Sequence, residues 1–160
     1  MKLLVLLGLF AVSAWASKTI PDEFLGKWVH EKDENYEEYL KKNGMNWLER
    51  KLWLRGGVTK VFAKDLEKGG YMLETRSPLR DIKYEGVQLG KQFTAQWRPS
   101  PKIKVTYDFV DGKLTENQIR FESQGAPEEH YAYHVKDGKL ILEIYIGDFV
   151  ARRYYKRADD

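Results

Sequence analysis

The sequence predicts an all-β fold: a ten-stranded antiparallel up-and-down β-barrel with a helix-turn-helix between its first and second strands. Glycine- and proline-containing turn signals recur at spacings of about 8–12 residues, which is typical of a sandwich or barrel. Most segments between them alternate apolar and polar residues, as half-buried strands do. The turn signals are Gly56-Gly57, Gly69-Gly70, Ser77-Pro78, Gly90, Pro99-Ser100-Pro101, Asp111-Gly112, Gly125-Ala126-Pro127, Asp137-Gly138 and Gly147-Asp148.

The first sixteen residues read as a secretory signal peptide outside the folded domain. Lys2 supplies the positive charge, Leu3–Val12 the apolar run, and Ala14-Trp15-Ala16 the small-residue cleavage signal. The run is shorter than the roughly 20 apolar residues that cross a membrane. We therefore expect cleavage after Ala16, an extracellular product, and one folded domain over residues 17–160.

Composition limits the classes of function. The chain has no cysteine, so a secreted domain of this sequence is stable without disulfides. Its 27 basic and 24 acidic residues are interspersed, which gives no support for nucleic-acid binding. We expect a monomer.

Two helices follow the first strand. We expect Asp33 to cap a helix over Glu34–Lys42, which Asn43-Gly44 ends. Asn46 and Glu49 have the spacing of a capping box at the start of a second helix.

The second helix is expected over Trp47–Arg55, and the pair would cover one end of the barrel and control the entry of a ligand. Tyr36 and Tyr39 form an apolar stripe on the first helix. On the second helix, we expect Trp47 to pack beneath the helices and Trp53 to remain on the surface.

The ten strands are expected where alternation runs between turn signals. Asp111-Gly112 and Asp137-Gly138 are dipeptides of tight hairpins, so strands adjacent in sequence are expected to pair. The strands are Phe24–Glu31, Val58–Asp65, Gly70–Arg76, Arg80–Glu85, Lys91–Trp97, Lys102–Phe109, Lys113–Glu122, Glu128–Lys136, Lys139–Ile146 and Asp148–Arg157.

The last strand carries a candidate anion site. Arg153 and Tyr155 lie on one face of it, and a guanidinium with a phenol two residues on can donate several hydrogen bonds to one carboxylate. Alternatively, both side chains lie on a solvent-exposed edge, as most arginines do. A barrel of ten strands is too wide to fill with side chains, since eight strands already hold a small ligand. Closure into a barrel thus favours the carboxylate site.

Several segments together resemble the intracellular lipid-binding proteins, that is, the fatty-acid-binding proteins. These segments are Phe24-Leu25-Gly26-Lys27-Trp28, Glu34–Lys41, Arg50-Lys51-Leu52 and Arg153-Tyr154-Tyr155. The signal peptide together with the Tyr154-Tyr155-Lys156 ending of the last strand is similar to the secreted nematode type of this family, whose lipid-binding domain would span residues 17–160.

The resemblance implies a calycin-like barrel with a helical portal and a cavity for one long-chain fatty acid or a similar lipid such as a retinoid. It implies that Arg153 and Tyr155 hold the ligand carboxylate, and a second family arginine is best matched by Arg120. The residues expected at the cavity and portal are Tyr36, Tyr39, Trp47, Val105, Tyr107, Leu142 and Ile144.

Two alternatives remain open. A lipocalin-like carrier fits Gly26-x-Trp28, but the chain lacks the disulfide and late helix common in that family. A role in membrane or receptor contact fits the basic second helix, where Trp47 and Trp53 alternate with Arg50, Lys51 and Arg55.

Catalysis and metal binding are not expected. His130 and His134 share a strand face but would stand about 13 Å apart, too far to bind one metal ion. The sequence has no phosphate loop and no nucleophile elbow. We expect neither an enzyme nor a bound cofactor or metal.

Overall fold

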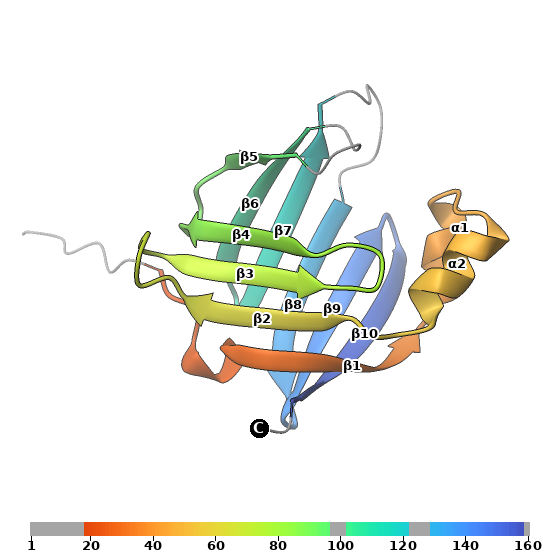
Figure 1. Ribbon diagram of the computed structural model, residues 1–160, viewed down its shortest axis with the longest axis horizontal. Coiled ribbons are helices and arrows are strands. Elements are labelled where there is room, and N and C mark those ends of the chain that lie inside the picture. The colour runs from red at the N-terminus through yellow and green to blue at the C-terminus, as the bar shows by residue number, and fades with distance from the viewer. Residues whose placement is uncertain (1–17, 97–101, 122–128, 159–160) are drawn as a thin grey trace, which may run out of the picture.

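The computed structural model describes residues 18–96, 102–121 and 129–158 of the 160-residue chain. The predicted signal peptide lies outside these residues. Ten antiparallel strands curl into a barrel-like sheet, and two helices stand at one end of it (Figure 1). The elements are a 3-10 helix η1 (Asp22–Phe24), helices α1 (Tyr36–Lys42) and α2 (Trp47–Leu54), and strands β1 (Gly26–Glu34), β2 (Thr59–Lys64), β3 (Tyr71–Arg76), β4 (Ile82–Val87), β5 (Phe93–Ala95), β6 (Ile103–Val110), β7 (Lys113–Arg120), β8 (Glu129–Lys136), β9 (Lys139–Ile146) and β10 (Phe149–Arg157). The predicted fold class is confirmed.

The sheet order is β4-β3-β2-β1-β10-β9-β8-β7-β6-β5, so the first and last strands are neighbours near its centre. Along β1 and β10, Trp28 lies opposite Arg157 and Asp33 opposite Arg153. The sheet therefore places Arg153 beside the end of β1 that leads into the helices.

Backbone closure of the barrel is incomplete, contrary to the expectation of a closed sheet. Among the described strands, β4 and β5 form the two edges and do not pair with each other. Side chains bridge them instead, with the rings of Tyr84 and Phe93 packed edge to face at 5.1 Å. β5 is also shorter than predicted, with three residues where seven were expected.

The hairpin dipeptides act as predicted. Asp111 and Gly112 have φ angles of 51° and 76°, and Asp137 and Gly138 have 51° and 71°. Positive φ at both central residues suits the twist of a two-residue hairpin. These turns fix the register of β6 with β7 and of β8 with β9.

The start of α1 corrects the prediction for Asp33. A bulge between His30 and Lys32 lets β1 continue to Glu34, so Asp33 is a strand residue and not a helix cap. Asn35 precedes the helix with φ of 57° and makes no capping hydrogen bond through its side chain. The capping box of α2 is confirmed, since Asn46 Oδ1 accepts from the Glu49 amide at 3.0 Å and Glu49 accepts from the Asn46 amide at 3.1 Å.

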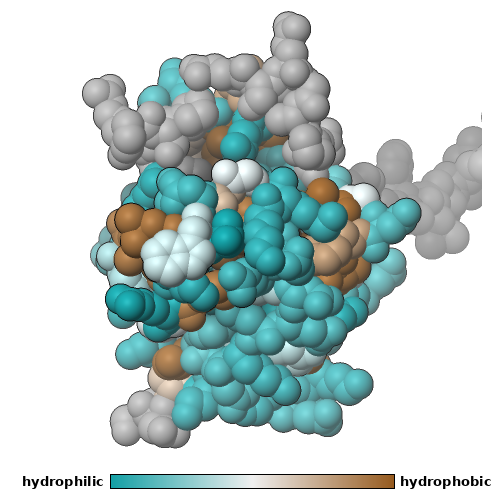
Figure 2. Space-filling model, turned by 90° about the vertical axis from the view of Figure 1, so that its right-hand side faces the viewer, coloured by the Kyte–Doolittle hydropathy of each residue, from teal (hydrophilic) through white to brown (hydrophobic). Residues whose placement is uncertain are grey.

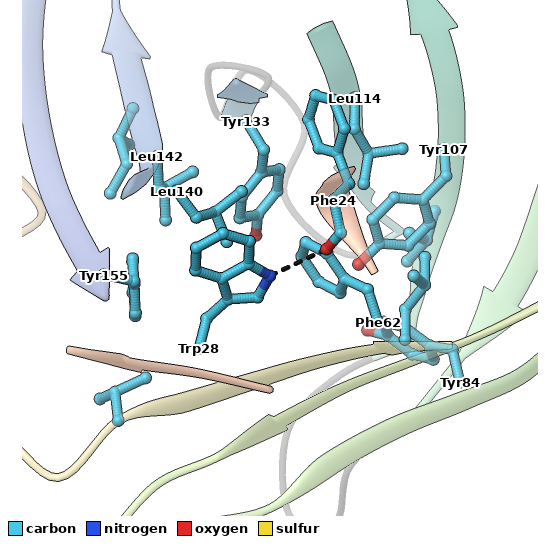
Figure 3. Packing of buried hydrophobic residues seen from close by; sticks show 14 of the residues in the cluster. Phe24, Trp28, Phe62, Tyr84, Tyr107, Leu114, Tyr133, Leu140, Leu142 and Tyr155 are labelled. Carbon is cyan, nitrogen blue, oxygen red and sulfur yellow. Dashed lines mark hydrogen bonds between the residues drawn. The ribbon is translucent and has the colours of Figure 1, made fainter. Parts of the chain in front are cut away.

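Apolar side chains fill the barrel near η1, at the opposite end of β1 from the helices. Trp28 is fully buried and its indole nitrogen donates to the Phe24 carbonyl at 2.8 Å (Figure 3). Phe24 also packs edge to face on Phe109 at 5.5 Å. Residues from η1, β1 and β6 thus fill this end of the barrel.

Candidate functional site

A cavity of about 430 Å³ lies inside the barrel beneath the helices. This volume falls within the range of roughly 300–1,000 Å³ that is typical of small-molecule sites. Both helices and most strands contribute to its walls, and the side chains discussed below that line it are Tyr36, Tyr39, Trp53, Lys60, Thr75, Tyr84, Tyr107, Glu116, Gln118, Arg120, Glu129, Tyr131, Tyr133, Leu142, Ile144, Arg153 and Tyr155.

Arg153 is an interior residue of β10 with only 3% of its side chain exposed. Its Nε donates to Asp33 Oδ1 at 2.8 Å, and its guanidinium carbon lies 4.0 Å from the centre of the Tyr36 ring. Burial acts to lower the pKa of Arg153, but the surrounding Tyr155, Tyr36 and Asp33 more than offset it and hold the pKa above its usual value. The guanidinium is therefore a permanent cation in the cavity wall, already paired with one carboxylate.

Asp33 links this arginine to a histidine. His30 Nε2 lies 2.7 Å from Asp33 Oδ1, the oxygen that also accepts from Arg153. Burial acts to raise the pKa of Asp33, yet the His30 hydrogen bond and the charge of Arg153 outweigh it and keep the pKa below its usual value. Asp33 therefore stays ionised and positions the arginine.

Tyr155 follows Arg153 on the inward face of β10 and is fully buried. Its hydroxyl has no hydrogen-bond partner among the described residues. Burial raises the pKa of this phenol, so the hydroxyl keeps its proton and is a donor. A buried donor with no partner beside a cation is suited to an anionic ligand oxygen.

The structure places Arg120 at the last residue of β7, on the rim of the cavity. Its side chain is 54% exposed and pairs with Glu129 at 2.7 Å. Tyr131 donates to the same carboxylate, and its hydroxyl lies 3.3 Å from that of Tyr39. Arg120 thus belongs to a rim cluster, separate from the contacts of Arg153.

Five of the seven residues expected at the cavity and portal line it. Tyr36 and Tyr39 do so from α1 with stacked rings 5.5 Å apart, and Leu142 and Ile144 do so from β9. Tyr107 lines it as well, whereas Val105 is buried outside it. The expectation for the two tryptophans is wrong: Trp47 is 63% exposed and Trp53 lines the cavity. α2 is turned so that its start faces solvent.

Four polar residues of the cavity wall were not predicted from the sequence: Lys60, Thr75, Glu116 and Tyr133. Lys60 on β2 donates to Thr75 Oγ1 at 2.8 Å and to the Tyr133 hydroxyl at 3.2 Å, which itself donates to Glu116 Oε2 at 3.1 Å. Burial lowers the pKa of Lys60 to about 8, partly offset by the negative charge of Glu116. The alternation of strand residues could have identified Lys60 as an inward residue, because it lies two residues from each of the buried Val58 and Phe62.

Two further findings concern the described part of the chain. It holds no group of three or more histidine, aspartate or glutamate side chains that could bind a metal ion. None of its helices has the length and apolar character needed to cross a membrane.

Comparisons with known proteins agree with this architecture. The chain is 32% identical to fatty acid-binding protein homolog 3 of Caenorhabditis elegans over 148 residues, covering 92% of this chain and 90% of the relative. It is 32% identical to the fatty acid-binding protein homolog of Ascaris suum, covering 96% of each. The solved structure of As-p18, an extracellular fatty acid binding protein, superposes with a TM-score of 0.81 at 32% identity, covering 88% of this chain and 100% of that one. No protein-family model matches the chain.

Proposed function

The chain belongs to the fatty-acid-binding protein family, a family of non-enzymatic carriers, and from that premise we propose that it is a secreted carrier of one long-chain fatty acid, held in the barrel cavity with its carboxylate at Arg153 and Tyr155.

The unpartnered hydroxyl of Tyr155 is the observation that carries the carboxylate site. Asp33 is bonded to Nε and one terminal nitrogen of Arg153, at 2.8 and 3.4 Å. A guanidinium has five N–H groups, so it can donate to a second carboxylate while it keeps the first. A ligand carboxylate would then accept from Arg153 and Tyr155 together.

The alkyl chain supplies most of the binding free energy. Each methylene removed from water contributes about 0.8 kcal/mol, and the walls offer Leu142, Ile144 and the tyrosine rings to receive it. The hydrogen bonds to the carboxylate contribute less, because desolvation of the charges offsets much of their attraction. These hydrogen bonds instead make the affinity for a fatty acid higher than the affinity for its ester.

The test compares a fatty acid with its methyl ester. Removing Arg153 alone would leave the partly buried Asp33 without its arginine partner, so the variant is Arg153→Met with Asp33→Asn. We expect the delipidated variant to bind the acid more weakly by about 1–3 kcal/mol, on the scale of charged hydrogen bonds, and to bind the ester nearly as well as the wild type does.

Arg152→Met is the matched control, because Arg152 pairs with Glu34 on the opposite face of the same strand. Equal losses for acid and ester would make Arg153 a structural residue. If a fluorescent fatty acid showed no saturable binding to the wild type, the carrier function itself would be abandoned. Mass spectrometry of the lipid that copurifies would distinguish a fatty acid from a retinoid.

Secretion rests on residues 1–16, whose charged, apolar and small-residue regions have the order of a signal peptide. Expression of the full chain in a secreting eukaryotic cell should give a product in the medium that begins at Ser17. Retention of the uncleaved chain inside the cell would contradict it.

Contact with membranes is a second candidate function. Trp47 and Leu48 are 63% and 61% exposed at the start of α2, next to the basic residues Lys51 and Arg55. Figure 2, which looks onto the helical end, shows small apolar areas in a largely hydrophilic surface. Co-sedimentation with anionic vesicles should fall in a Trp47→Ser, Leu48→Ser variant, and unchanged co-sedimentation would contradict this role.

A further inference from the structure

A second polar cluster lies in the cavity wall, apart from the contacts of Arg153. It consists of Lys60 on β2, Thr75 on β3, Glu116 on β7 and Tyr133 on β8, all of which line the cavity. Tyr133 connects its two charges, since it accepts from Lys60 Nζ at 3.2 Å and donates to Glu116 at 3.1 Å. Figure 3 shows Tyr133 extending into the interior between Leu140 and Phe24.

The cluster has one N–H bond of Lys60 without an acceptor among its members, and both oxygens of Glu116 already accept hydrogen bonds. An ammonium group carries three N–H bonds, and those of Lys60 reach two acceptors, Thr75 and Tyr133. Both oxygens of Glu116 already accept, one from Tyr133 and the other from Gln118 at 2.6 Å. An oxygen atom of a ligand is therefore the group that would complete the coordination of Lys60.

Charge decides which kind of oxygen fits. Asp33 pairs with Arg153 directly, whereas Glu116 opposes the charge of Lys60 from the other side of the Tyr133 hydroxyl. A second carboxylate at Lys60 would lie close to Glu116 and be repelled by it, whereas an uncharged hydroxyl or carbonyl oxygen would not. An alkyl chain without such an oxygen would cover Lys60 and leave one of its N–H groups buried without a partner, at a cost in affinity.

We propose that the Lys60–Tyr133–Glu116 cluster is a specificity site for fatty acids that carry an uncharged oxygen function, a hydroxyl or keto group, along the alkyl chain. It rests on the proposed function, because it concerns a second group of a ligand whose carboxylate is held by Arg153 and Tyr155. The carboxylate of the ligand would bind at Arg153 and Tyr155, and the oxygen on its alkyl chain would bind at Lys60 in the same cavity.

The test measures the affinity of the delipidated wild-type protein for octadecanoic acid and for hydroxyoctadecanoic acids with the hydroxyl at successive positions along the chain. We expect at least one positional isomer to bind about tenfold tighter than the unsubstituted acid, the scale of one hydrogen bond to a charged donor. The preference should depend on position, because Lys60 is fixed in the wall.

The variant is Lys60→Met with Glu116→Gln, which removes both charges and keeps side chains of similar length. It should bind octadecanoic acid at least as well as the wild type and lose the preference for the hydroxylated isomer. Lys64→Met is the matched control, since Lys64 is on the same strand but pairs with Asp22 on the surface, and it should keep the preference.

Each outcome decides the proposal. Tight binding of octadecanoic acid with no preferred isomer would overturn the specificity site and leave the proposed function intact. Absence of binding for every acid would overturn both. If the double variant did not fold, the wild-type series would still decide, since a position-dependent preference supports the site and a flat series refutes it.

Discussion

At the scale of the residue, the interior of this barrel holds charges at positions that alternate with apolar ones. Lys60 lies two residues after Val58 and two before Phe62, and Glu116 lies two residues after Leu114. Because successive strand residues face opposite sides, a charge between two inward apolar residues also points inward. Each such charge has a partner, which is the condition under which a buried charge is tolerated.

Because the pKa of Lys60 is lowered in the folded protein, the free energy of unfolding should change with pH in the alkaline range. Its pKa is about 8 in the folded protein and 10.5 when unfolded, so between these values the unfolded chain binds more protons. Stability contributed at this position therefore increases as the pH rises from 8 toward 10.5. The free energy of unfolding of the wild type minus that of Lys60→Met should rise by on the order of 1–3 kcal/mol over this interval. Urea denaturation at several pH values measures it, and a difference that stays constant would show that the amine titrates normally.

Tyr155→Phe should separate binding from stability. The hydroxyl has no partner among the described residues, so its removal should leave the unliganded protein equally stable or up to about 1 kcal/mol more stable. The affinity for a fatty acid should fall by about tenfold, because one donor to the carboxylate is lost. Thermal denaturation and ligand titration of the same samples check both, and a destabilised variant with normal affinity would refute the assignment. Tyr154→Phe, whose hydroxyl contacts Glu34 on the outer face, is the control.

At the scale of the element, the two helices are short and depend on local contacts. α1 has seven residues and α2 has eight, lengths at which an isolated helix is not stable in water. α2 has no fully buried residue, so its capping box is an important part of what holds it. A cover of this kind can open at low cost.

Asn46→Ala should therefore increase the rates of ligand entry and release. Loss of the cap costs the helix about 1 kcal/mol, while the cavity walls on the strands are unchanged. We expect both rates to rise several-fold in stopped-flow measurements, with the dissociation constant nearly unaltered. Lys51→Ala, in the same helix but outside the cap, should leave the rates near those of the wild type. Unchanged rates for Asn46→Ala would exclude α2 as the entrance.

At the scale of the whole molecule, local patterns predicted most of the fold. Alternation and turn dipeptides specify each strand from a few neighbouring residues, so ten strands and the Asp-Gly hairpins could be found. Three features could not be predicted, because they depend on contacts between residues that are far apart in the sequence. The bulge that keeps Asp33 in β1 arises from pairing with β10. The rotation of α2 that exposes Trp47 depends on packing over the barrel, and the hydrogen-bond partners of Lys60 come from two other strands.

The unpaired edges of β4 and β5 predict an uneven pattern of amide exchange. Backbone amides of β9 have paired strands on both sides, whereas β5 pairs only with β6 over three residues. Exchange should be fastest in β5, intermediate in β4, and slowest in β9 and β10. Hydrogen–deuterium exchange with peptide-level mass spectrometry tests this order, and equal protection of β5 and β9 would contradict it.

The pairing of β1 with β10 has a consequence for how the protein is made. Asp33 and Arg153 are 120 residues apart in sequence, and at about 5–20 residues per second a ribosome needs roughly 6–24 s to synthesise the chain between them. Throughout that time β1 lacks its neighbour on one side, and the ion pair between Asp33 and Arg153 cannot form. The centre of the sheet is thus completed last, so a nascent chain released before β10 would expose an apolar strand edge in the middle of the fold. Contacts of such long sequence separation also slow folding, which makes this barrel dependent on the synthesis of its final nine-residue strand before it can hold any ligand.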